Sequence, residues 1–129
     1  MNSDSILDSV KKKLGILADY KTFDEEIIMD INTAFFILNQ LGVGPDEPFT
    51  IDDDIAIWDD FTEDSSQLRI VRSYVPLEVK LLFDPPSSSY VLENLKDKIA
   101  EYEFRMAAES EKRKLPRVDM SGIYSDEEG

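Results

Sequence analysis

The sequence predicts an all-α protein, a small bundle of about four to five helices with a projecting acidic loop, a long C-terminal helix and a flexible tail. Apolar residues recur at helical spacing in several segments, and glycine, proline and acidic residues gather between those segments. The 129 residues fit one domain, since domains usually contain about 100–150 residues, and the 42% hydrophobic content is sufficient for one core.

The first helix is expected over residues 5–14, with Ser3, Asp4 and Ser5 offering N-cap oxygens and Gly15 ending it. Its core face consists of Ile6, Leu7, Val10 and Leu14. Its last turn carries the cations Lys11, Lys12 and Lys13. They have two interpretations: favourable partners of the helix dipole, or a docking patch for an acidic neighbour.

The second helix is expected to begin at Thr22 and Glu25, which have capping-box spacing, and to end at Leu41 before Gly42. Its apolar surface is wider than one core-facing stripe requires, so the helix is either central in the core or shared with a subunit interface.

A long acidic segment follows, over residues 42–67, and we expect a projecting, partner-facing loop with space for a small β-hairpin. Its acidic residues are Asp52, Asp53, Asp54, Asp59, Asp60, Glu63 and Asp64. The candidate interface residues on this loop and on the second helix are Phe36, Ile37, Phe49, Ile51, Trp58 and Phe61.

The acidic segment does not have the spacing of a calcium loop. An EF-hand that started at Asp52 would need glycine at its sixth position, where Ile57 stands. A solvated acidic loop is therefore expected, with no bound metal.

A third helix is expected over residues 68–83, with a kink or break near Val75, because Pro76 removes an amide donor and clashes with the preceding turn. The last helix is expected to start after the serines at 87–89 and to reach Lys112. About 24 residues would span some 36 Å, so we expect its end to project from about Ala108 onward. This divides the chain into a helical domain, 1–107, and a projecting end with a tail, 108–129.

The C-terminal end carries a second basic cluster and then an acidic tail. The cluster consists of Lys112, Arg113 and Lys114. The tail lacks helical periodicity, yet it contains the apolar residues Leu115, Val118, Ile123 and Tyr124. We expect these four residues to dock on a partner.

Composition excludes several function classes. The chain has neither histidine nor cysteine, which removes imidazole general bases, thiolate nucleophiles and most zinc sites. We therefore expect no enzyme, no cofactor and no metal. The net charge of -14 disfavours gripping DNA, which needs a basic stripe. Two classes remain: a DNA mimic that binds a nucleic-acid-binding partner, or a protein that stands beside DNA without holding it.

Several short stretches, taken together in their order and spacing, resemble the head-to-tail connector (adaptor) family of long-tailed phages. The resemblance covers about residues 4–106, although Pro76 departs from the helix former expected there. The stretches are residues 4–7, 14–16, 20–23, 30–33, 40–45, 58–61, 73–75 and 80–86.

The resemblance implies a structural virion protein of the neck between head and tail, made in the host cytoplasm. It further implies a homo-oligomeric ring of about twelve copies beneath the portal protein, which receives head-closure or tail proteins on its other side. Double-stranded DNA would pass through such a ring without specific binding, since an acidic lumen repels phosphates. No stretch approaches the roughly 20 apolar residues of a membrane span, so we expect no membrane partner.

Overall fold

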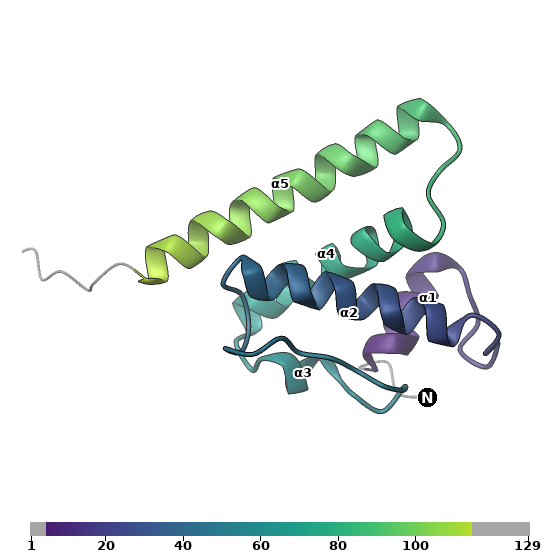
Figure 1. The fold of residues 1–129 in the computed structure, drawn as a ribbon, viewed down its shortest axis with the longest axis horizontal. Helices are drawn as coiled ribbons and strands as arrows, with labels where there is room; N and C mark the ends of the chain where they lie inside the picture. Colours follow the sequence, from purple (N-terminus) through teal and green to yellow (C-terminus); the bar gives the residue numbers. More distant parts are fainter. Residues whose placement is uncertain (1–4, 115–129) are drawn as a thin grey trace, which may run out of the picture.

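The computed structural model describes residues 5–114, and its architecture is a helical bundle (Figure 1). The helices are α1 (Ile6–Leu14), α2 (Asp24–Gln40), α3 (Trp58–Phe61), α4 (Ser65–Phe83) and α5 (Ser89–Lys114). None of residues 5–114 lies in a β-strand, and the predicted all-α class is confirmed. The core lies between α2 and α4, while α1, α3 and α5 pack around it.

Both ends of α1 form as predicted. The Ser5 hydroxyl accepts a hydrogen bond from the Asp8 amide at 3.2 Å, which makes Ser5 the N-cap. Gly15 has φ 81°, the left-handed conformation in which glycine ends helices at little cost.

The predicted capping box of α2 is wrong. The helix begins at Asp24, and the N-cap residue Phe23 supplies no side-chain hydrogen bond. A turn in which the Asp24 amide donates to the Lys21 carbonyl precedes the helix instead. The acidic residues Asp24, Glu25 and Glu26 of the first turn favour the positive end of the helix dipole.

The acidic segment after α2 is neither a hairpin nor a projecting loop. Asn32 binds Ile51 through two hydrogen bonds, of 2.8 and 3.1 Å, which hold the segment against α2. The Ile6 amide donates to the Ala56 carbonyl at 2.9 Å, which holds it against α1. In place of the predicted β-hairpin, only the isolated bridge between Ser5 and Ile57 forms within the described residues.

Helix α4 continues through Pro76, so the predicted break is wrong. Pro76 is buried, and the core-facing residues Val71, Val75 and Val79 on the same helix are fully buried. A single lost backbone hydrogen bond costs less than this packing contributes. Asp64 caps the start, where its carboxylate accepts from the amides of Ser66 and Gln67.

Helix α5 crosses the bundle and packs against it beyond its first turns. Tyr90 and Val91 near its start are 76% and 48% exposed, whereas Ile99 and Met106 are buried. Figure 1 shows the first turns of α5 carried away from the body by the connection after α4. Projection from Ala108 onward is contradicted, since Ser110 is buried and its hydroxyl donates to the Gly42 carbonyl at 3.2 Å.

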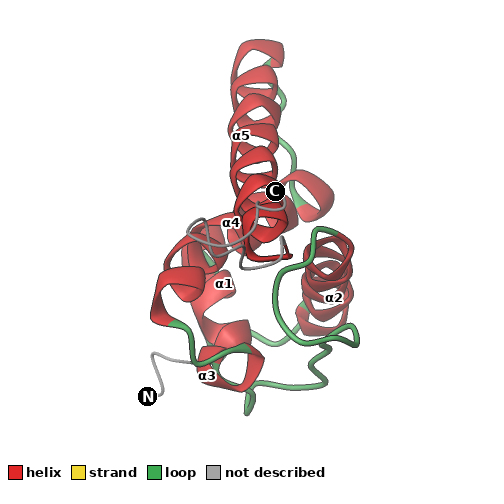
Figure 2. Cartoon of the chain, turned by 90° about the vertical axis from the view of Figure 1, so that its left-hand side faces the viewer, coloured by secondary structure: helices red, strands yellow, loops and turns green. Residues whose placement is uncertain are grey.

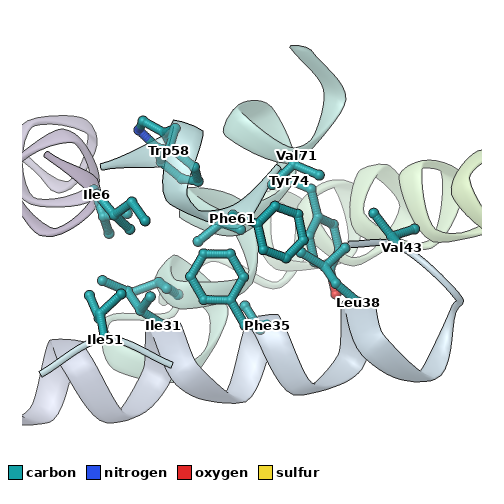
Figure 3. Close-up of a cluster of buried hydrophobic side chains, with 14 of the residues drawn as sticks. Ile6, Ile31, Phe35, Leu38, Val43, Ile51, Trp58, Phe61, Val71 and Tyr74 are labelled. Atoms are coloured by element: carbon teal, nitrogen blue, oxygen red, sulfur yellow. The ribbon is translucent and has the colours of Figure 1, made fainter. Parts of the chain in front are cut away.

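An aromatic cluster fills the centre of the core (Figure 3). The ring of Phe35 on α2 lies 5.0 Å from the rings of both Phe49 and Phe61, and 6.3 Å from Trp58. Edge and tilted ring pairs of this kind stabilise a core beyond their buried area. The cluster joins the acidic segment to α2.

Candidate interaction surfaces

Lys11, a candidate electrostatic contact, lies in the interior of the chain. Its side chain is fully buried, and its ammonium forms a 2.7 Å ion pair with Asp24. The same ammonium donates to the carbonyls of Ala18 and Tyr20, at 3.0 and 2.7 Å. These bonds hold the connection between α1 and α2, so Lys11 is not available to a partner. Lys12 and Lys13 beside it are exposed.

Most of the predicted interface residues also belong to the core. Ile51, Trp58 and Phe61 are 2%, 1% and 4% exposed, which corrects their assignment to a partner surface. The Trp58 indole donates to the Ser9 hydroxyl, and Phe49 packs against the core. These residues are buried because the acidic segment folds back onto α1 and α2.

The outer face of α2 is exposed and both apolar and acidic. Phe36 is 50% exposed and Met29 is 69% exposed, on the side of the helix opposite Phe35 and Ile31. Ile37 is only partly buried against the core. Glu25 and Glu26 are exposed in the first turn of the same helix. Of the predicted interface residues, Phe36 therefore remains accessible.

A groove opens between α1, α4 and α5, with a volume of about 360 Å³. Lys13, Lys80 and Lys98 line it, one from each helix, and its apolar walls include Leu77 and Tyr102. We call it the basic groove. A smaller cavity beside it shares Lys13 and Pro76 and adds Arg72, whose guanidinium lies 5.6 Å from the Trp58 ring centre.

A cluster of carboxylates lies between α2, α4 and α5. Burial, then the charges of Glu103 and Asp30, raise the pKa of the Glu78 carboxyl above its ordinary value. Burial and the neighbouring Glu26 raise the pKa of Asp30. The Tyr74 hydroxyl donates to Glu103 at 2.7 Å, and burial chiefly raises its own pKa. At neutral pH, the carboxylates of this cluster repel one another inside the bundle.

The family model for the phage connector protein matches residues 6–113, which include all five helices except the last residue of α5. The chain belongs to the phage connector protein family. This confirms the resemblance found in the sequence. Comparisons with curated proteins and with solved structures gave no match.

For this connector, the remaining predicted contact residues lie at the end of the chain. Lys112 is exposed near the end of α5. The side chains of Arg113 and Lys114, and the tail residues Leu115, Val118, Ile123 and Tyr124, lie outside the described side chains.

Within residues 5–114, no group of three or more acidic side chains is placed to hold a metal ion. None of the helices described there combines the length and apolar content of a membrane span.

Sequence reasoning missed several exposed residues on the surface of the connector. Met29, Lys80 and Lys98 lie at two of the faces described above, and Phe104 is 74% exposed on α5. The signal that was available is helical spacing: each of the exposed apolar residues lies off the core-facing stripe of its own helix.

Proposed function

We propose that this connector forms a ring of about twelve copies beneath the portal protein, extends the DNA channel and receives the head-closure or tail proteins. The observation that carries the proposal is membership of the connector family over residues 6–113. A structural role in the virion neck also agrees with the basic groove, whose lining consists mainly of lysines and apolar residues.

The exposed faces of the chain support assembly. Tyr90 and Val91 at the start of α5 and Phe104 further along it are apolar and exposed, as are Met29 and Phe36 on α2. Apolar positions rimmed by charges are typical of surfaces that bind other proteins. A ring that lies between two partner proteins needs several contact surfaces. The exposed apolar residues of α2 and α5 supply such surfaces.

The ring is tested by co-expressing the connector with the portal protein of the same phage, followed by size-exclusion chromatography and negative-stain microscopy. We expect the two proteins to elute together and rings to appear on the portal. Separate elution with no rings would overturn the proposal. A DNA mimic would instead remain a monomer or dimer and bind a nucleic-acid-binding protein.

We further propose that the acidic segment between α2 and α4 faces the channel and repels the DNA backbone. Asp52, Asp59 and Glu63 are exposed. They make none of the hydrogen bonds and ion pairs described in residues 5–114, so these carboxylates are not required by the fold. Fixed negative charges beside a channel lower the occupancy of phosphates at its wall. DNA then passes without forming ion pairs.

The channel role is tested by genome ejection from phages that carry Asp52→Asn, Asp59→Asn and Glu63→Gln together. We expect slower ejection with normal numbers of assembled particles. The matched control removes three exposed charges from α5, with Glu93→Gln, Asp97→Asn and Glu111→Gln, and should eject normally. Equal ejection rates in both variants would contradict the role of the acidic segment.

A further inference from the structure

The basic groove concentrates positive charge on a chain of strongly negative net charge. Lys13, Lys80 and Lys98 converge on it from three helices, although the chain carries 14 basic against 28 acidic residues. Lys80 forms a surface ion pair with Asp84, at 3.0 Å. Neither Lys13 nor Lys98 has an ion-pair partner among residues 5–114.

The walls of the groove decide what kind of ligand fits it. Leu77, Pro76 and Tyr102 form apolar walls of the groove, which the three lysines also line. Gathering like charges is unfavourable unless an opposite charge arrives, and apolar walls favour an apolar side chain over a small ion. The complementary partner therefore carries carboxylates and exposed apolar side chains together.

The outer face of α2 has that composition. Glu25, Met29 and Phe36 lie on one side of the helix, since they are spaced by about one and then two helical turns. Glu26 adds a second exposed carboxylate in the first turn. We call these four residues the α2 ridge. It extends over about 16 Å, because Glu25 and Phe36 are eleven positions apart and the helix rises about 1.5 Å per position.

The groove and the ridge face opposite directions. On α4, Leu77 and Lys80 lie roughly half a turn away from Val75 and Val79, which face the core on the side of α2. In Figure 2, α2 lies on the right, while α1 and α4 lie nearer the middle of the molecule. Two different, complementary faces on opposite flanks can form a head-to-tail contact, and such contacts build a ring when the rotation between successive copies closes.

We propose that the basic groove of one copy of this chain receives the α2 ridge of the next copy. The inference rests on the proposed ring and names the surfaces that build it. Glu25 and Glu26 of the ridge pair with Lys13 and Lys98 of the groove, and Met29 packs against its apolar walls. Local pairing of this kind offsets the repulsion between acidic subunits.

Charge exchange tests the pairing. The groove variant carries Lys13→Glu and Lys98→Glu, and the ridge variant carries Glu25→Lys and Glu26→Lys. Each alone should weaken ring formation on the portal about tenfold or more, because like charges then meet across the contact. A chain with all four substitutions should recover assembly. All of these positions are exposed, and circular dichroism checks that each variant is folded.

The control reverses two other exposed lysines, with Lys96→Glu and Lys112→Glu, and should assemble as the wild type does. If the wild type forms rings and the groove and ridge variants form them equally well, the pairing is overturned and the ring stands. If each variant fails and the combined chain fails too, the two faces do not meet. If the wild type forms no rings, both the ring and the pairing are overturned.

Discussion

The buried ion pair of Lys11 offers the sharpest prediction about stability. Replacing Lys11 with methionine keeps most of the side-chain volume and removes the ammonium. Asp24, whose side chain is 18% exposed, then loses its 2.7 Å partner. The carbonyls of Ala18 and Tyr20 lose their donor as well.

The expected cost follows from these contacts. Breaking a buried pair by removing one partner usually costs about 3–5 kcal/mol, since the other charge stays behind without compensation. Each carbonyl left without a donor adds about 1–3 kcal/mol where water is excluded. Ala18 and Tyr20 are exposed, so water can replace the lost donor at their carbonyls and these terms add little. Asp24 retains some access to water, which places the cost of the broken pair near its lower end, and we expect a total of about 3–4 kcal/mol. That is a large part of the 5–15 kcal/mol that typically holds a domain folded.

The measurement is urea unfolding followed by circular dichroism. With a slope of about 1–3 kcal/mol per molar urea, the loss lowers the midpoint by about 1–4 M. The matched control is Lys12→Met, an exposed neighbour in the same turn, which should cost less than about 1 kcal/mol. Adding Asp24→Asn to Lys11→Met should cost less than the two single losses summed. Equal midpoints for the Lys11 and Lys12 variants would refute the reasoning.

Three further predictions use the same measurement. The raised pKa of Glu78 means that the folded state holds this proton more tightly than the unfolded chain does, so Glu78 lowers stability as the pH rises above about 4.5. Glu78→Gln should therefore raise stability at pH 7 and reduce the dependence of stability on pH. No gain in stability at pH 7 would contradict this prediction. Gly44→Ala should cost about 2–4 kcal/mol, since φ is 92° and an added Cβ would overlap the Phe61 ring, whereas Gly15→Ala should cost less because its Cβ meets nothing. Tyr74→Phe removes the hydrogen bond to Glu103 and should cost about 1–2 kcal/mol, and an unchanged midpoint would show that water replaces it.

Local signals predicted the helices better than they predicted the connections. Ser5 and Gly15 bound α1 as expected, because caps depend on residues adjacent in sequence. The acidic segment was misjudged because its position depends on Asn32, 19 residues away from Ile51. Contacts between residues this far apart in the sequence produce no periodic pattern in it.

The surface was predictable only in part for a related reason. Spacing shows which residues share a face of one helix, but the basic groove requires three helices to be placed together. Lys11 illustrates the limit: its neighbours Lys12 and Lys13 have the same charge and lie in the same turn, yet only Lys11 points inward to Asp24. Sequence alone does not separate a structural lysine from a surface one here.

The positions of the charged residues change what the net charge implies for contacts between copies of the chain. A uniformly acidic subunit would repel its copies over the Debye length of about 10 Å at 0.1 M salt. Here Lys11 is buried and holds the fold, whereas Lys13 on α1 and Lys98 on α5 line the basic groove and have no ion-pair partner among residues 5–114. The carboxylates of the α2 ridge lie on the opposite flank. In the ring that we propose, a neighbouring copy and the DNA backbone would meet different faces of the chain, so attraction at the flanks and repulsion at the acidic segment are compatible.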